Sequence, residues 1–214
     1  IKNNKTLWQK AVLLFDKDLM TDVHRQLLME GFEGKMGIKT HIWQSYCFES
    51  VLFSNMSTLL RLLQRFIKSK HSLDANTADL NQYFETALIA QINAKEERIK
   101  AGSLFNTEVG KFQSRRKKLI DKDLKMELKD IIEQDAHLQR TLETYWQNCC
   151  TFDRFHEIMN KKDIETVLNT VLQHFNIDFV LDEDNGRNDF DDLFACIDII
   201  TEPNEYNVFS TFIR

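Results

Sequence analysis

Apolar residues recur at helical spacing along most of this chain of 214 residues, and the pattern predicts a mainly α-helical protein. In the first 31 residues this spacing predicts one amphipathic helix, which ends at a glycine-rich connection, GFEGKMG (31–37). A single proline in the whole chain supports long helices, because proline breaks helices most strongly. The apolar positions of this first predicted helix are Leu7, Trp8, Ala11, Val12, Leu14, Phe15, Leu19, Val23 and Leu27.

Two further helices are predicted between residues 40 and 92. An apolar run from 40 to 71 carries few charges in its middle, which predicts a deeply buried second helix. Asp74, Asn76 and Thr77 then offer N-cap side chains for a third helix. The apolar positions are Trp43, Cys47, Val51, Leu59, Leu60, Leu63, Phe66 and Ile67 in the second helix, and Leu80, Phe84, Leu88 and Ile92 in the third.

From Asp121 onward, apolar residues follow a seven-residue repeat that is typical of coiled-coil-like packing over about four heptads. Asp135 occupies one position of this seam, where it indicates either a local end of the seam or a buried pair with a basic residue. The seam consists of Leu124, Leu128, Ile131, Leu138, Leu142, Tyr145 and Cys149. Together these patterns predict an antiparallel array of long amphipathic helices over residues 1–150.

The sequence pattern of residues 151–214 predicts a small α+β unit with two helices and two or three strands. Helical spacing continues through Phe155 and again from Asp163 to Phe175. The next segment, NIDFVLDE, alternates apolar and polar residues, and Asn185-Gly186 is a good hairpin turn because both residues tolerate positive φ. The segments ACIDII and YNVFSTFI are further strand candidates. We place the domain boundary near residue 151, and a winged helix is one topology that fits the second unit.

Composition and cysteine usage indicate an intracellular, soluble protein. The net charge of −5 is mild, and no segment is apolar enough over about 18 residues to predict a membrane span. The four cysteines lack the CxxC spacing, which favours reduced, buried thiols in a cytoplasmic protein. A chain that starts at Ile1 without a methionine is consistent with a fragment of a longer protein.

The most acidic stretch of the chain is LDEDNGRNDFDD (181–192). A calcium loop of the EF-hand type is excluded here, because Leu181 would occupy the first ligand position when Gly186 occupies the sixth. The stretch therefore predicts a solvated hairpin tip, and its functional alternative is an acidic docking loop for a basic partner. The residues of that loop are Asp182, Glu183, Asp184, Asp189, Asp191 and Asp192.

The opposite charge lies between Arg98 and Lys129, where ten basic residues stand against four acidic ones. Such a stretch can neutralise phosphates, so it is a candidate contact for nucleic acid or for an acidic partner. A solvated helix end and an intramolecular contact with the acidic stretch are the alternatives. The centre of this stretch is Arg115, Arg116, Lys117 and Lys118.

Arg65 and His71 are separated by five residues in RFIKSKH. The spacing resembles the Arg–His pair of the helical HEPN ribonucleases, and this resemblance implies a pair that acts on the scissile phosphate. It covers seven residues, and Phe66 replaces the polar residue that usually follows the arginine. The alternative interpretation is that both basic residues interact with the dipole at the end of a helix.

The sequence contains no HExxH metal motif, no glycine-rich phosphate loop and no GxSxG nucleophile, so we expect no metal and no cofactor. The leading hypothesis is a non-enzymatic scaffold or protein–protein interaction module of a larger intracellular assembly. The first alternative is a nucleic-acid-associated winged helix, of the protein-binding sort found in complexes that organise chromosomes. The second alternative is the HEPN-like ribonuclease. Another protein is the expected partner, nucleic acid is a possible one, and no membrane is expected.

Overall fold

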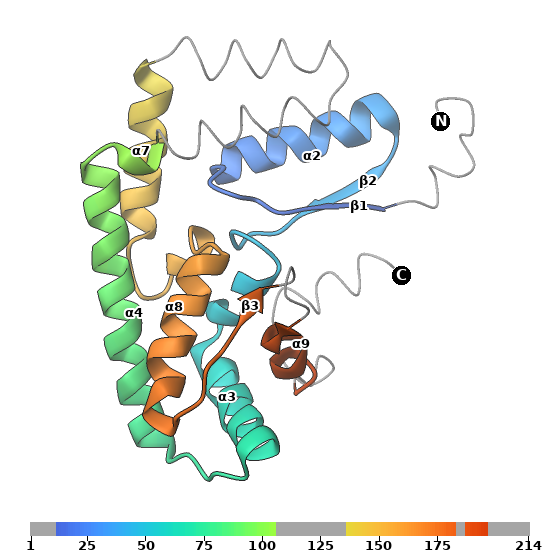
Figure 1. Cartoon of the computed structure of the whole chain (residues 1–214). Coiled ribbons are helices and arrows are strands. Elements are labelled where there is room, and N and C mark those ends of the chain that lie inside the picture. The colour runs from blue at the N-terminus through green and yellow to red at the C-terminus, as the bar shows by residue number, and fades with distance from the viewer. Residues whose placement is uncertain (1–11, 106–135, 183–186, 197–214) are drawn as a thin grey trace.

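The computed structural model describes the chain over residues 12–105, 136–182 and 187–196. Over these ranges the protein is mostly helical, which confirms the mainly α prediction, and it contains two small two-stranded sheets (Figure 1). No helix in these ranges is both long and apolar enough to cross a membrane. The α-helices are α2 (Asp22–Met36), α3 (Met56–His71), α4 (Thr77–Lys100), α7 (Ala136–Cys149), α8 (Lys161–Leu172) and α9 (Asp189–Phe194). The strands are β1 (Val12–Phe15), β2 (Lys39–Ile42), β3 (Leu181–Asp182) and β4 (Arg187–Asn188), and the 3-10 helices are η1 (Glu49–Ser54), η2 (Phe155–Glu157) and η3 (Gln173–Phe175).

A helical body forms around α4 and α8, which lie side by side in Figure 1. Asparagine side chains begin these helices: Asn76 caps α4 as the sequence predicts, and Asn160 forms a capping box with Asp163 at the start of α8. The two helices are also joined by a buried ion pair, in which Lys95 Nζ lies 2.5 Å from Asp163 Oδ2. The core of the body includes Leu59, Leu63, Phe84, Leu88, Phe155, Val167 and Leu168.

This apolar core draws residues from both sides of position 151, where the sequence suggested a domain boundary. Trp146 of α7 and Ile164 of α8 belong to the same cluster of buried side chains. The boundary itself stays a prediction.

The predicted first helix is wrong over residues 12–21, and its residues 1–11 lie outside the described residues. Residues 12–15 form β1, which pairs in parallel with β2 and is connected to it by α2. The run VLLF is apolar and short, so periodicity alone could not separate a strand from a helix there. A turn with Asp18 at φ 52° follows the strand, and Thr21 then caps α2 by accepting a hydrogen bond from His24 N.

The glycine-rich connection is also wrong, because α2 continues through it. The helix passes Gly31 and Gly34 and ends only at Gly37, whose φ of 65° is the left-handed conformation that favours glycine after a helix. Glycine costs a helix about 1 kcal/mol relative to alanine but does not end it unless the backbone turns left-handed there.

The predicted second helix is divided into β2, a loop, η1 and α3. Trp43, Cys47 and Val51 are buried as predicted, but they lie in the loop and in η1 rather than on a continuous helix. Asn55 adopts an extended conformation and caps α3, which accounts for the break. The apolar residues of this segment were therefore correctly assigned to the core, while their secondary structure was not.

The C-terminal part contains α8, the antiparallel hairpin β3–β4 and α9. The pairing of Leu181 with Asn188 confirms the hairpin, although its turn residues Asn185 and Gly186 lie outside the described residues. The helical prediction through Phe155 is wrong after Cys149, where α7 ends. The start of the predicted strand ACIDII is a turn, its remainder and YNVFSTFI lie outside the described residues, and so does the coiled-coil-like seam before residue 136.

Candidate functional site: the arm and its anchor

The segment β1–α2–β2 (residues 12–42) forms an arm that projects from the helical body (Figure 1). Its two strands, β1 and β2, are parallel, with Val12 opposite Lys39 and Phe15 opposite Ile42. The arm combines two features: charged side chains that attach it to the body, and apolar side chains that remain exposed.

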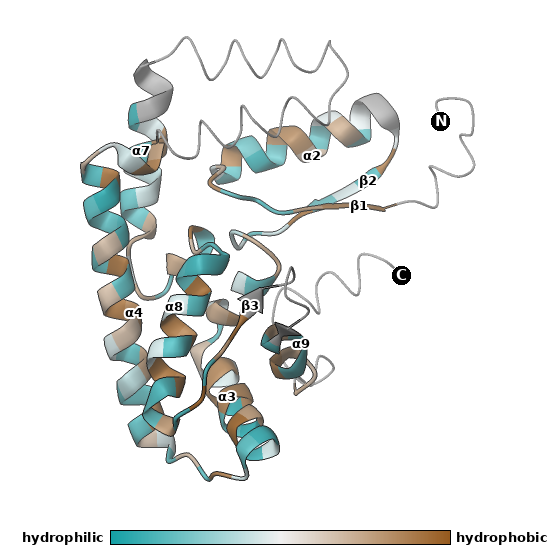
Figure 2. Cartoon of the chain, in the orientation of Figure 1, coloured by the Kyte–Doolittle hydropathy of each residue, from teal (hydrophilic) through white to brown (hydrophobic). Residues whose placement is uncertain are grey.

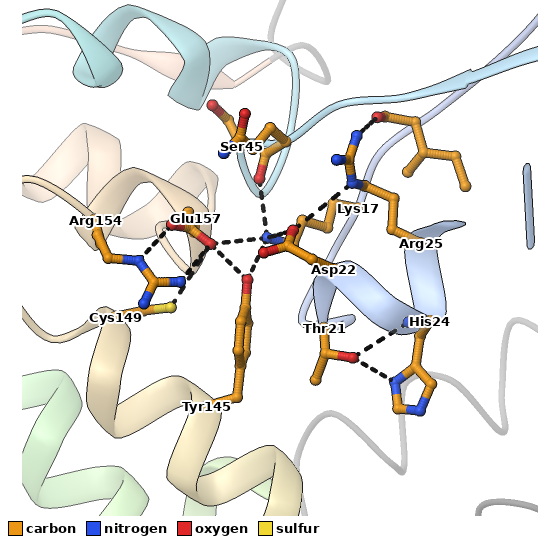
Figure 3. Close-up of polar contacts among 12 residues, drawn as sticks. Lys17, Thr21, Asp22, His24, Arg25, Ser45, Tyr145, Cys149, Arg154 and Glu157 are labelled. Carbon is orange, nitrogen blue, oxygen red and sulfur yellow. Dashed lines mark hydrogen bonds and ion pairs between the residues drawn. The ribbon is translucent and has the colours of Figure 1, made fainter. Parts of the chain in front are cut away.

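Lys17, directly after β1, carries the attachment to the body (Figure 3). Its side chain is fully buried, and its ammonium group donates to Gln44 O at 3.0 Å, to Tyr145 Oη at 2.6 Å and to Glu157 Oε2 at 3.1 Å. Asp22 Oδ1 lies 3.3 Å away as a second carboxylate. The ammonium group thus has an acceptor for each of its three N–H bonds, which is what a buried charge requires.

Glu157 is the carboxylate at the centre of this cluster. Arg154 approaches it with two nitrogens, Nε at 2.7 Å and Nη2 at 3.1 Å, and the Tyr145 hydroxyl donates to it at 2.5 Å. Burial acts to raise the pKa of Glu157, but these hydrogen bonds and the charge of Lys17 outweigh it and lower the pKa to about 2. Glu157 is therefore ionised at neutral pH.

The two neighbouring side chains that could serve as bases or nucleophiles are held protonated. Burial, together with the hydrogen bond to Glu157, raises the pKa of Tyr145 well above its ordinary value. Burial and the charge of Glu157 raise the pKa of the Cys149 thiol to about 12. Every charge of this cluster is paired, and its phenol and thiol are protonated at neutral pH, so the contacts of the cluster join the arm to the body.

Further contacts fix the arm and the loop that follows it. Trp146 Nε1 donates to Leu19 O at 2.9 Å in a buried position, and Tyr46 N donates to His156 O at 2.9 Å. Arg25 of α2 donates to Ile42 O of β2 at 3.0 Å. The arm is thus attached through charged, aromatic and backbone groups at once.

The arm also carries most of the large apolar side chains that are exposed among the described residues. Six large apolar side chains are exposed there, and four of them belong to the arm, with exposed fractions of 43 % for Leu14, 40 % for Phe15, 64 % for Val23 and 60 % for Leu27. Val23 and Leu27 lie one helical turn apart and so share a face of α2. Figure 2 shows the apolar course of β1 and the apolar positions along α2.

Three carboxylates gather where β1 ends. Asp16 accepts a hydrogen bond from Phe48 N at 3.2 Å, and Glu49 pairs with Lys161 Nζ at 2.8 Å. Partial burial and the charges of Glu49 and Asp18 hold the pKa of Asp16 above its ordinary value, against the opposing hydrogen bond from Phe48.

The ribonuclease pair predicted from sequence, Arg65 and His71, lies on α3. Arg65 Nη1 donates to Cys196 O at 2.9 Å, and His71 is the exposed last residue of the helix. Phe66, between them, is buried in the core. His71 thus lies in the last turn, as expected for a basic residue at the end of a helix, whereas Arg65 lies before that turn and bonds to Cys196 O. Catalysis by the pair stays a prediction.

The acidic stretch is divided between a hairpin and a helix. Asp189, Asp191 and Asp192 lie in the first turn of α9, where carboxylates favour a helix, rather than in a loop. Asp192 pairs with Lys70 at the end of α3, with 2.5 Å between Oδ2 and Nζ. Asp182 ends β3, whereas Glu183 and Asp184 lie outside the described residues, as do all four basic residues at positions 115–118.

The cysteines are free, as predicted, and Cys47 and Cys149 are buried. Within the described ranges, no group of three or more His, Cys, Asp or Glu side chains is arranged to hold a metal ion.

Sequence reasoning missed Lys17 and Glu157. The available signal was the Asp-Lys-Asp triplet directly after the apolar run VLLF, because charged residues at the carboxyl end of a parallel strand commonly lie in a site. No comparable signal marks Glu157, whose role depends on contacts across more than a hundred residues of chain.

No protein-family model matches the chain, and neither the curated proteins nor the solved structures contain a significant match.

Proposed function

We propose that this chain is a non-enzymatic interaction module of a larger intracellular assembly, and that its arm binds another protein. The observation that carries the proposal is the concentration of exposed apolar side chains on the arm, at Leu14, Phe15, Val23 and Leu27. Large apolar side chains that stay exposed together on one segment of a protein are a common mark of a binding site. The buried anchor supports the proposal further, because a rigidly held surface loses little entropy on binding.

A photo-crosslinking amino acid at position 27 tests this function. In lysate of the native cells, we expect a discrete crosslinked protein that is absent when the same group replaces the exposed Glu85 of α4. The captured protein counts as a partner only if, once purified, it binds the chain and loses about tenfold affinity or more when Val23 and Leu27 are both changed to Gln. Equal background at both positions, or unchanged affinity of the double variant, would contradict the proposal.

A second candidate function is binding of a divalent cation together with a phosphate-bearing ligand. Asp16 follows the carboxyl end of β1, and the hydrogen bond that it accepts from Phe48 N places it beside the segment that carries Glu49. Ligands commonly bind at this end of parallel strand–helix–strand units. These side chains do not enclose a cation by themselves. Magnesium ions, however, are commonly held by one or two carboxylates plus phosphate oxygens and water, which suits such a partial site.

Calorimetric titration with magnesium chloride, in the presence and absence of a short single-stranded DNA, tests this second function. Binding should occur in wild-type protein and be lost in Asp16→Asn, whereas Asp153→Asn, which changes an exposed carboxylate of the body, should bind normally. Equal heats for all three proteins would exclude the cation site.

Three predictions from the sequence remain proposals. They are an antiparallel array of long helices, a winged-helix arrangement of residues 151–214, and a nucleic-acid contact through Arg115–Lys118. A gel shift at low salt with those four residues changed to Glu tests the nucleic-acid contact.

A further inference from the structure

We propose that the exposed edge of β1 accepts an extended segment of the partner protein as a third strand of the sheet. This inference rests on the proposed function and names a second contact of the same partner, beside the face of α2 that carries Val23 and Leu27. It follows from the backbone geometry of the sheet, from the unequal burial of its two strands, and from the residues that flank β1.

The parallel sheet of the arm has fewer strands than parallel sheets usually have. Among the described residues, β1 and β2 pair only with each other. Parallel sheets are normally extended and covered on both faces, and a two-stranded sheet is marginally stable by itself. A further strand would give the arm the arrangement that parallel sheets ordinarily have.

The backbone of β1 shows which groups face the open edge. Phe15 O accepts a hydrogen bond from Trp43 N, next to the end of β2, so the N–H and C=O of Phe15 point towards β2. Alternate residues of a strand point their backbone groups to opposite sides, so those of Leu14 point away from β2. Leu14 therefore offers one donor and one acceptor to an incoming strand.

The side chains of the two strands differ in burial. Thr40, His41 and Ile42 of β2 are buried, whereas Leu14 and Phe15 of β1 are exposed. The segment VLLF carries no charge and no proline, the features by which edge strands are normally protected from pairing. The unprotected edge is thus on β1.

The backbone and side-chain groups at the edge of β1 indicate which kind of segment would bind there. It is extended, because the edge offers backbone hydrogen bonds, and apolar or β-branched, because its side chains lie beside Leu14 and Phe15. A basic residue at one end suits the carboxylates of Asp16 and Asp18, which directly follow β1.

The experiment selects binders from a displayed library of random 12-residue peptides and measures the best synthetic peptide by fluorescence anisotropy. We expect selected peptides rich in Val, Ile, Thr and aromatic residues. Leu14→Pro removes the outward N–H without removing a bond to β2, so it should weaken binding about tenfold or more, whereas Leu14→Val should stay within about twofold. The double change of Val23 and Leu27 to Gln should also stay within about twofold.

A second measurement does not depend on how well the proline variant folds. N-methylation of alternate backbone nitrogens in the peptide should abolish binding in one register and leave it unchanged in the other, as a strand pairing along one edge requires. Failure to select any peptide, or equal tolerance of both registers, overturns the inference. Binding that survives Leu14→Pro but is lost in the Val23 and Leu27 variant overturns the strand-edge inference and supports the proposed function through α2.

Discussion

Glu157 connects the arm to the body at the level of single residues, because Lys17 from the arm and Tyr145 and Arg154 from the body all bond to its carboxylate. Glu157→Gln removes the buried negative charge and leaves the fully buried ammonium group of Lys17 with the partly exposed Asp22 as its remaining carboxylate. We expect the free energy of unfolding to fall by about 3–5 kcal/mol, the range measured when one partner of a buried pair is removed. Urea denaturation at pH 7 measures this change.

The matched control adds Lys17→Met to Glu157→Gln. Because the double variant no longer buries an unpaired ammonium group, it should recover a large part of the lost stability. A single variant within about 0.5 kcal/mol of wild type would show that the cluster is solvated and does not anchor the arm.

The pH dependence of stability follows from the same carboxylate. The pKa of Glu157 is about 2 in the folded protein against an ordinary value of 4.5. A lowered folded-state pKa contributes stability that is present above pH 4.5 and is lost as pH falls towards 2, by about 3 kcal/mol in total. The difference in unfolding free energy between wild type and Glu157→Gln should therefore shrink over this window. A difference that stays constant from pH 6 to pH 2.5 would contradict the assignment.

At the level of elements, α2 is where sequence pattern and structure disagree most clearly, and two glycines separate the alternatives. Gly31 lies inside the helix, and an added Cβ would meet nothing within 4 Å, so Gly31→Ala should stabilise the protein by about 0.5–1 kcal/mol. Gly37 has a φ of 65°, so Gly37→Ala should destabilise it by about 1 kcal/mol. Thermal unfolding of both variants measures these opposite signs. Destabilisation by Gly31→Ala would restore the glycine-rich connection that the sequence suggested.

The elements that periodicity predicted well are those with strong local signals. The third predicted helix corresponds to α4, because Asn76 caps it and Leu80, Phe84 and Leu88 repeat at helical spacing on its buried face. The N-terminal segment was mispredicted because VLLF satisfies a helical and an extended pattern equally, and only its parallel pairing with β2, more than twenty residues away, decides between them. The helix α9 was missed because its acidic residues resemble a solvated loop.

For the whole molecule, the mainly α composition and the buried apolar residues could be predicted from the sequence, whereas the candidate site could not. The anchor joins Lys17 to Tyr145 and Glu157, and the exposed surface of the arm exists only because α2 and β1 turn apolar residues outward. Sequence periodicity assigned Leu14, Phe15, Val23 and Leu27 to a buried face, since an apolar stripe is normally a core stripe. Their exposure is a property of the assembled arm.

Amide hydrogen exchange of the free protein, resolved by NMR, tests most directly whether the arm presents an open β1 edge. Because the backbone of Phe15 and of Leu13 points towards β2 and that of Leu14 points away, the amides of Leu13 and Phe15 should be protected while that of Leu14 exchanges rapidly. The selected peptide should then protect Leu14 without changing its neighbours. Strong protection of Leu14 in the free protein would show that the edge is already covered and would contradict the account.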